Sequence, residues 1–266
     1  MSNKKEFDDV AVEALGSVAV VRLNDPKTMN AISPRMMGGL EQALAHVDRP
    51  ENGFRAFVLT GTGRGFCSGA NLTTTGPDDI TRQDDFGAVL KRSYYPVLKH
   101  LRALRIPSIA AVNGPAMGFG LSLALMCDLV LAAKSAFFQL TFSRIGLVPD
   151  GGAAWLLPRV VGLARAHELI VLAERLSAEK AHAWGLVNQL HDDDKLLDSA
   201  IGLAGELTKR PTRTLTLVRQ AYWQGLDNSY DEQLELEAKL QSAAGKAGDF
   251  IEGVMAFREK REPKFD

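Results

Sequence analysis

The sequence predicts an α/β fold that is followed by an all-helical C-terminal region. Short, nearly all-apolar strands run into glycine-rich turns and then into helices, a pattern that recurs at residues 56–72, 108–127 and, more loosely, 136–158. Strands this apolar are usually covered on both faces, which indicates crossover connections. From about residue 195 helical patterns follow one another without strands. We therefore expect two parts, residues 1–194 and residues 195–266.

The first elements are marked by turn and capping residues. VAVVRLND is typical of a strand that ends in a turn at Asp25-Pro26. SPRMMGGLEQALAHVD predicts a helix, with Ser33 as its N-cap and Pro34 at its first position. FRAFVLTGTG predicts a second strand that runs into a glycine-rich turn.

The middle of the chain continues the same alternation. Residues 84–104 predict a long amphipathic helix that is disturbed at Pro96. PSIAAVNG predicts a third strand, PAMGFG a turn and LSLALMCD a helix; LVLAA and AFFQL predict short strands. Two further helices are expected in AAWLLPRVVG and ARAHELIVLAERL. In the second part we expect consecutive helices over residues 196–210, 211–226, 230–245 and 249–261.

Composition excludes several classes of protein. The 266 residues carry a formal net charge of −1, so nothing suggests attraction to nucleic acid or to an anionic membrane. The polar N-terminus lacks the apolar core of a signal peptide, and the longest apolar stretch is interrupted at Asp128. Cys67 and Cys127 lie far apart and lack CxxC partners, which favours a reducing cytoplasm and argues against structural zinc.

The turn GTGRGFCSGANL follows a strand, as a dinucleotide fingerprint does, but its spacing fails. Counting from Gly61 the third glycine position is Phe66, and counting from Gly63 it is Ser68. A Rossmann site is therefore disfavoured. The alternative interpretation is a tight turn that needs glycine for positive φ angles.

A second turn, NGPAMGFG, carries Gly118 and Gly120 at a strand-to-helix junction. Glycines there let a ligand approach the backbone and the unpaired N–H groups of the helix start. Close packing of helix and strand explains them equally well. Ser122 is not a convincing nucleophile, because GLSLA lacks the last glycine of GxSxG.

The histidines form no catalytic or metal-binding pattern. None belongs to an HExxH, HxxxH or His-Cys cluster, so surface or packing roles are favoured for all five: His46, His100, His167, His182 and His191. HDDDK at residues 191–195 lacks the spacing of an EF-hand loop and is best interpreted as a solvated loop. No residue is therefore predicted to bind a metal.

In GLVPDGG, residues 146–152, one carboxylate stands among apolar residues and glycines. Burial beside Leu147, Val148 and Trp155 would raise the pKa of Asp150 from about 3.9 toward neutrality, which suits a general base. The alternative is that Asp150 caps the helix that begins near Gly152. Two donor-rich turns and one base suit enolate formation from a thioester, because N–H groups hold the oxyanion while the base moves the α proton.

Taken together, these stretches resemble the crotonase superfamily, the enoyl-CoA hydratase/isomerase group. The resemblance rests on GRGFCSGANL, on AAVNGPAMGFGLSLALMCDLVLAA, on FSRIGLVPDGG with the stretch after it, and on the ending EGVMAFREKREPKF. It implies a spiral of ββα units over residues 1–194, holding an acyl-CoA active site, and a helical trimerisation region over residues 195–266. It also implies a homotrimer or a dimer of trimers.

By motif position, the resemblance implies that the main-chain N–H groups of Ala70 and Phe119 form the oxyanion hole. It implies a CoA-contacting set made of Lys27, Met29, Ser68, Gly69, Ala70, Asn71, Leu72, Gly118, Lys264 and Phe265. The last two residues of this set are expected to reach a CoA molecule, including one in a neighbouring subunit. CoA is part of the substrate, so no separate cofactor is expected.

Two departures from the family pattern bear on the reaction. Hydratases of this family carry two glutamates, and the corresponding positions here are Ser122 and Phe142. Asp150 in PDGG resembles the acid of the single-carboxylate isomerases, which include the phenylacetate-pathway isomerase and the Δ3,Δ2-enoyl-CoA isomerases. The expected reaction is a Δ3-to-Δ2 double-bond shift. Hydration, oxepin-forming isomerisation of an aromatic epoxide, and a non-catalytic acyl-CoA-binding protein remain alternatives. A ClpP-like serine protease is disfavoured because no histidine stands at a suitable position.

Overall fold

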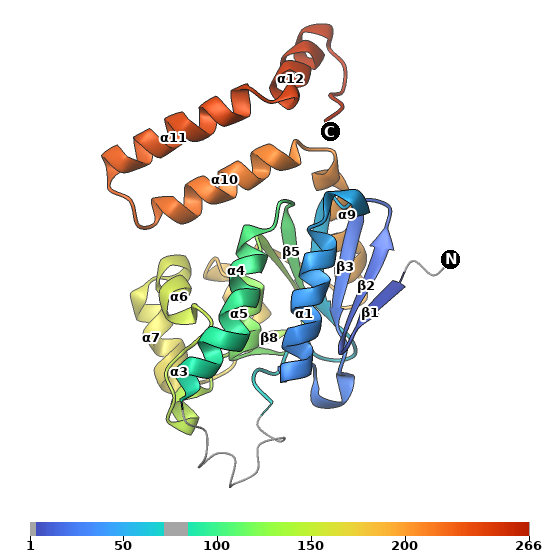
Figure 1. The fold of residues 1–266 in the computed structure, drawn as a ribbon. Helices are drawn as coiled ribbons and strands as arrows, with labels where there is room; N and C mark the ends of the chain where they lie inside the picture. The colour runs from blue at the N-terminus through green and yellow to red at the C-terminus, as the bar shows by residue number, and fades with distance from the viewer. Residues whose placement is uncertain (1–3, 72–84, 266) are drawn as a thin grey trace.

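The computed structural model describes residues 4–71 and 85–265 and contains two β-sheets (Figure 1). In these residues the larger sheet has seven strands, in the order β1-β2-β3-β4-β5-β7-β10. They are β1 (Lys4–Phe7), β2 (Val10–Leu15), β3 (Val18–Leu23), β4 (Ala56–Gly61), β5 (Ser108–Val112), β7 (Leu129–Ala133) and β10 (Gln189–His191). The smaller sheet has the order β6-β8-β9 and consists of β6 (Ala116–Met117), β8 (Phe137–Gln139) and β9 (Leu176–Ser177).

The larger sheet is parallel from β3 to β10, as the apolar strands predict. Every residue of β4 and β5 is buried, so both faces of these strands are covered. The antiparallel strands β1 and β2 were not predicted from the sequence. The β1 sequence KKEF is largely exposed at the edge of the sheet, and a polar edge strand lacks the apolar pattern that marks a central one.

Helices cover the two faces of the larger sheet. Helix α1 (Pro34–Val47) contacts β1, β2 and β3, and α9 (Leu196–Thr208) contacts β3, β4, β5, β7 and β10. Figure 1 shows α1 in front of the sheet and α9 behind it. The predicted cap of α1 is confirmed, because the Ser33 side chain accepts a hydrogen bond from the N–H of Met36 over 3.1 Å.

The long helix predicted over residues 84–104 is interrupted. It consists of α3 (Phe86–Val89), a π-helical turn (Leu90–Tyr94) and α4 (Tyr95–Ala103). The disturbance expected at Pro96 therefore lies in the turn before it. Proline is tolerated in the first turn of α4, where its missing N–H costs no helical hydrogen bond. A π-helical turn inside a helix often marks a functional site.

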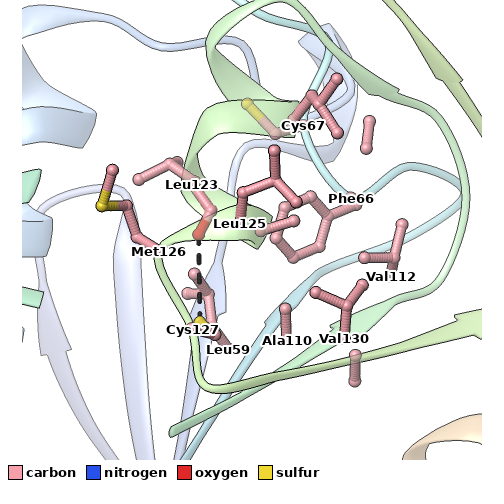
Figure 2. Close-up of a cluster of buried hydrophobic side chains, with 14 of the residues drawn as sticks. Leu59, Phe66, Cys67, Ala110, Val112, Leu123, Leu125, Met126, Cys127 and Val130 are labelled. Carbon is pink, nitrogen blue, oxygen red and sulfur yellow. Dashed lines mark hydrogen bonds between the residues drawn. The ribbon is translucent and has the colours of Figure 1, made fainter. Parts of the chain in front are cut away.

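The hydrophobic core ties the glycine-rich turns to the parallel sheet. Helix α5 (Phe119–Leu125) is buried along its whole length. Figure 2 shows Leu123 and Leu125 of this helix in one cluster with Phe66 and Cys67, which belong to the first glycine-rich turn. The turn is therefore anchored by buried side chains, which leaves its backbone fixed in place.

The remaining helices form two groups. Helix α6 (Ala153–Val161) contacts α5 and α7 (Leu163–Leu172), and α8 (Ala178–Ala183) contacts β8 and β9 of the smaller sheet. The C-terminal region continues through α10 (Thr212–Gly225), α11 (Tyr230–Gly245) and α12 (Gly248–Glu259), which extend away from the sheets in Figure 1. This confirms the predicted all-helical ending. None of the described helices is long and apolar enough to cross a membrane.

Two contacts fasten α10 to the rest of the chain. The buried Arg219 side chain donates to both carboxylate oxygens of Asp128 and to the carbonyls of Leu104 and Ile106. The ring of Trp223 stacks on that of Trp155 in α6, with centroids 5.4 Å apart and an interplanar angle of 7°. The C-terminal helices are thereby connected to the helix that begins just after Asp150.

Candidate active site

Three turns lie side by side and form the floor of the candidate site. The first is the 27–31 turn, and its neighbour is the glycine-rich turn that contains Ser68 and Gly69. Ser68 donates from its hydroxyl to the carbonyl of Thr28 over 2.8 Å, and the N–H of Ile32 donates to the carbonyl of Gly69 over 2.7 Å. The second glycine-rich turn joins through a parallel bridge between Cys67 and Ala116.

The two glycine-rich turns approach each other too closely for side chains. Gly69 has a φ of 91°, and a Cβ atom there would lie 3.0 Å from the carbonyl oxygen of Met117 and 3.8 Å from the Cα of Gly118. Gly118 has a φ of 50° and would meet the Cα of Gly69 at 3.9 Å. Both positions favour glycine because of their positive φ angles, and at Gly69 a Cβ atom would also be tight against the Met117 carbonyl. The residues that follow them, Ala70 and Phe119, are brought to the same place.

The main-chain N–H groups of Ala70 and Phe119 are both free to bind a ligand. Within the described part of the chain neither N–H donates a hydrogen bond. The neighbours of Ala70 make the hydrogen bonds to Ile32 instead. The carbonyl of Gly69 accepts from the N–H of Ile32, and the N–H of Asn71 donates to the carbonyl of Ile32. Phe119 begins α5, where N–H groups lack intrahelical acceptors. Two adjacent free donors of this kind suit a developing oxyanion.

The 27–31 turn is held by a buried amide. Asn30 has a φ of 58° and is fully buried. Its side chain accepts from the N–H of Asp25 and donates to the carbonyls of Thr62 and Gly65. These hydrogen bonds fix the 27–31 turn to the first glycine-rich turn. Met29 is half-buried and Lys27 is exposed on its surface, both beside the candidate CoA strip.

Asp150 is half-buried, and one of its carboxylate oxygens has no partner. Oδ1 is inaccessible to solvent and makes no hydrogen bond within the described residues. Burial raises the pKa of Asp150 from 3.8 to about 6. A buried unpartnered acceptor destabilises a folded protein, and perturbed carboxylates of this kind gather at functional sites. Asp150 is therefore suited to accept a proton near neutral pH.

The side chain of Asp150 does not cap α6. The N-cap of this helix is Gly152, with a φ of 82° and no side-chain capping bond. Asp150 contributes only its main-chain carbonyl, which accepts from the N–H of Ala153 over 3.0 Å. The alternative interpretation of Asp150 as a helix cap is wrong, and its carboxylate is left for other use.

The segment that carries Asp150 packs directly on the start of α5. A Cβ atom on Gly151 would lie 2.7 Å from the Cβ of Ser122 and 2.9 Å from the Cδ2 of Phe119. The Ser122 hydroxyl donates to the main-chain carbonyl of Asp150 over 3.1 Å. The acid and one of the two donors are thus fixed to the same short helix. Ser122 therefore holds the main chain of Asp150, and the sequence did not favour it as a nucleophile.

The two positions at which hydratases carry glutamates hold no carboxylate. Ser122 is fully buried, and Phe142 is buried with its ring tip 3.7 Å from the position of a Cβ on Gly118. The thiol of Cys67 is fully buried, which raises its pKa to about 12 and keeps it neutral. Asp150 is the carboxylate that these contacts place beside the start of α5.

Sequence reasoning missed one polar group near the acid, the hydroxyl of Tyr94. The Tyr94 ring meets the Phe119 ring edge to face, with centroids 5.0 Å apart and an interplanar angle of 89°. Burial, and then the negative charge of Asp150, raise the pKa of Tyr94. An aromatic residue at helical spacing is indistinguishable from an ordinary core residue in the sequence. The π-helical turn, which ends at Tyr94, is visible only in the structure.

Two of the expected CoA-contacting residues, Lys264 and Phe265, are not brought to this site. The N–H of Lys264 donates to Glu252, and the ring of Phe265 lies near Gly253, so both residues pack against α12. Figure 1 places this end of the chain away from α5 and α6. Leu72 lies outside the described residues.

The described residues offer no metal site, and a cavity that they form lies away from the turns. No group of three or more His, Cys, Asp or Glu side chains within them is placed to hold a metal ion. A cavity of about 390 Å³ lies between α4 and α10 and is lined by residues such as Lys99, Arg102 and Trp223. It includes neither Asp150 nor the turns, so we do not assign it to the reaction.

Comparison with protein families gives a match over nearly the whole chain. Residues 13–266 match the family described as enoyl-CoA hydratase/isomerase. The chain is 44% identical over 248 residues to the 1,2-epoxyphenylacetyl-CoA isomerase of Escherichia coli (strain K12), covering 93% of this chain and 94% of that protein.

Solved structures agree with the family match. The structure of Pseudomonas aeruginosa DspI superposes with a TM-score of 0.90 at 31% identity, covering 98% of both chains. An enoyl-CoA hydratase from Polaromonas sp. JS666 superposes with a TM-score of 0.88 at 32% identity, covering 97% of this chain and 99% of that one. The fold predicted from the resemblance is thereby confirmed.

Proposed function

Because this chain belongs to the enoyl-CoA hydratase/isomerase family, we propose that it isomerises an acyl-CoA thioester by moving a double bond from the Δ3 to the Δ2 position. The substrate thioester carbonyl lies against the N–H groups of Ala70 and Phe119. Asp150 is the acid and base of the reaction. The family itself includes both hydratases and isomerases, so the choice between them rests on the carboxylates of the site.

The proposed steps conserve every atom of the substrate. The ionised Asp150 carboxylate takes a proton from C2 of the 3-enoyl-CoA, and the electron pair of that C–H bond forms the enolate. The two N–H donors stabilise the enolate oxygen. The protonated Asp150 then returns the proton at C4 while the enolate collapses to the Δ2 thioester. One carboxylate is sufficient for this exchange.

The observation that carries the proposal is the isolation of Asp150. Its Oδ1 is buried without a partner, its pKa is raised to about 6, and Ser122 and Phe142 replace the two carboxylates that hydration uses. Water addition needs a group to activate water and a group to protonate the α carbon. A single acid that already lies beside the oxyanion donors suits proton transfer within the substrate.

The test is to assay a 3-enoyl-CoA and a trans-2-enoyl-CoA side by side with the purified protein. We expect isomerisation of the first to exceed hydration of the second by at least about 100-fold, a difference of roughly 3 kcal/mol in barrier. Brisk hydration would contradict the proposal. Binding of both thioesters without conversion of either would favour the non-catalytic alternative.

A second candidate reaction is the isomerisation of a ring-epoxide acyl-CoA. The observation that favours it is the 44% identity to the Escherichia coli protein named 1,2-epoxyphenylacetyl-CoA isomerase. The same base and the same donors would serve it, since that substrate is also a CoA thioester with an acidic α carbon. Including 1,2-epoxyphenylacetyl-CoA in the assay separates the two candidates.

The surfaces of the C-terminal helices support self-association. Large apolar side chains are exposed on α10, on α11, on α12 and between them: Val218, Tyr222, Leu226, Tyr230, Leu234, Phe250, Ile251, Met255 and Phe257. Exposed apolar surface on this scale marks an interface. We place the contacts of a homotrimer, or of a dimer of trimers, on these helices. Lys264 and Phe265 would then reach the CoA of a neighbouring subunit.

The CoA moiety is assigned to the strip formed by the turns. Ser68, Gly69, Ala70 and Asn71 lie on one run of backbone, beside Gly118. The 27–31 turn, with Lys27 exposed and Met29 half-buried, borders this run. An exposed lysine beside a donor-rich backbone suits the anionic end of CoA.

A further inference from the structure

Tyr94 packs on Phe119, which carries one of the two candidate oxyanion donors, and lies near enough to Asp150 for the two charges to interact. It is the last residue of the π-helical turn Leu90–Tyr94. Its ring meets the ring of Phe119 edge to face. A Cβ atom on Gly151, next to Asp150, would lie 2.9 Å from Cδ2 of the same Phe119 ring. Aromatic contacts of this geometry fix the orientation of both rings. The ring that carries the Tyr94 hydroxyl is therefore held in place against Phe119.

The Tyr94 hydroxyl is a free donor. It has no hydrogen-bond partner among the described residues. The Oδ1 atom of Asp150 is shielded from solvent without a partner, whereas the Tyr94 hydroxyl is not shielded in this way. It therefore remains open to solvent or to a ligand. The raised pKa keeps the phenol protonated at neutral pH, so it retains the proton that a donor needs.

The hydroxyl does not serve Asp150. No hydrogen bond joins the two residues, and Oδ1 of Asp150 is left without a partner. A phenol that donated to this carboxylate would stabilise the charged form and lower the pKa of Asp150, whereas the pKa is raised. Burial, and then the negative charge of Asp150, raise the pKa of Tyr94.

We propose that the Tyr94 hydroxyl donates a hydrogen bond to an oxygen atom carried by the acyl group near its α carbon, so that the site favours oxygen-bearing acyl-CoA thioesters. This inference rests on the proposed function, because it takes the α carbon to lie beside Asp150. A purely hydrocarbon acyl group would strip water from the hydroxyl without replacing the hydrogen bond, which is unfavourable. A phenylalanine would suit such a substrate better. An oxygen on the acyl group removes this cost.

The experiment compares two unreactive thioesters that differ by one oxygen atom, phenylacetyl-CoA and 2-hydroxyphenylacetyl-CoA. Dissociation constants are measured by calorimetry for the wild type, for Tyr94→Phe and for Tyr95→Phe. Tyr95→Phe is the matched control, since it removes the same hydroxyl one residue along the helix. Thermal unfolding of each variant checks that the fold is intact.

We expect the wild type and Tyr95→Phe to bind the hydroxylated thioester about tenfold more tightly than phenylacetyl-CoA, which is the effect of one hydrogen bond of about 1.4 kcal/mol. Tyr94→Phe should bind the two thioesters within about twofold of each other. A preference that survives in Tyr94→Phe, or that is absent from the wild type, overturns the inference.

Failure of the proposed function gives a different result. If the oxygen preference depends on Tyr94 but no 3-enoyl-CoA is isomerised, the role of Tyr94 is supported and the proposed double-bond shift is contradicted. If neither thioester binds, the role of Tyr94 and the proposed function are both contradicted. If both thioesters bind equally well and a 3-enoyl-CoA is isomerised, only the role of Tyr94 is lost.

Discussion

The hydroxyl of Ser122 donates a hydrogen bond to the main-chain carbonyl oxygen of Asp150 over 3.1 Å. Ser122 stands where hydratases of this family carry a glutamate, and here the residue holds the backbone of the acid instead. The space around it is filled, because Gly151 would place a Cβ only 2.7 Å from the Cβ of Ser122. The candidate site is therefore built around one carboxylate, and a side chain at position 151 would collide with Ser122.

Ser122→Glu should not create a hydratase. The new carboxylate would enter a fully buried position, and the second glutamate would still be missing at Phe142. Burying a charge without a partner should lower the free energy of unfolding by about 2–4 kcal/mol. Urea unfolding and a hydration assay with a trans-2-enoyl-CoA measure both effects, and Ser122→Ala is the size control. Hydration that rose to the rate of isomerisation would contradict this expectation.

Activity should fall on the acidic side of pH 6. Asp150 must be ionised to take a proton, and burial raises its pKa to about 6. The ratio kcat/KM, which reports the free enzyme, should therefore be constant above about pH 7 and fall tenfold for each pH unit below about pH 6. An unperturbed aspartate would keep the activity constant down to about pH 4. A pH profile between pH 4.5 and pH 8.5 separates the two.

Ala70→Pro should remove one oxyanion donor. The N–H of Ala70 makes no hydrogen bond within the described residues, and the neighbouring bonds to Ile32 use Gly69 and Asn71. The substitution should therefore lower kcat by about 10²–10³-fold, the usual effect of losing such a donor. Ala70→Ser keeps the N–H and is the control. Unchanged turnover in a folded Ala70→Pro protein would exclude Ala70 from the oxyanion hole.

Light scattering should show a trimer or a hexamer at micromolar concentration. The chain has a mass of 28.9 kDa, so three copies correspond to about 87 kDa. Phe257→Glu places a charge on one of the most exposed apolar side chains, which is 86% exposed, and should weaken the assembly. Lys260→Glu, a charge change close by on an already polar residue, is the control. A stable monomer would contradict the assignment of the C-terminal helices to the interface.

Much of the fold could be predicted from the sequence because it depends on local patterns. The apolar strands, the cap at Ser33 and the consecutive C-terminal helices are each recorded in a few neighbouring residues. The edge strand β1 was missed because a polar edge strand lacks an apolar pattern. Strand β2, which lies between β1 and β3, was missed although Val10, Ala11 and Val12 are buried in it. The π-helical turn was missed because it arises from the packing of one helix rather than from a distinctive motif.

The candidate site, like the fold, could be predicted only where it depends on local patterns. Asp150 was found because a carboxylate among apolar residues is unusual, and the glycines were found because their turns follow strands. The close approach of Gly69 to Gly118 joins residues about 50 positions apart, so no local pattern could show it. Tyr94 was missed because its neighbours, Phe119 and Asp150, come from two other segments.

A rise in pH should lower the stability contributed by Asp150, whereas it should raise the activity. The pKa of Asp150 is higher in the folded chain than in the unfolded one, so the folded state binds the extra proton between about pH 4 and pH 6. Stability is therefore lost as the pH rises through this window. Above it, Asp150→Asn should unfold less readily than the wild type by about 1–2 kcal/mol, allowing for the partly exposed carboxylate. The gain should vanish below about pH 4.

The most direct test of a single-acid isomerase is the turnover of a 3-enoyl-CoA by Asp150→Asn. Asparagine keeps the shape of the side chain and cannot accept the α proton. The account predicts that isomerisation falls by at least about 10⁴-fold, as for the loss of an essential general base, while the affinity for an unreactive acyl-CoA stays within a few-fold. Asp194→Asn, on an exposed loop, should keep full activity. An Asp150→Asn protein that isomerises the substrate at the wild-type rate would contradict the account.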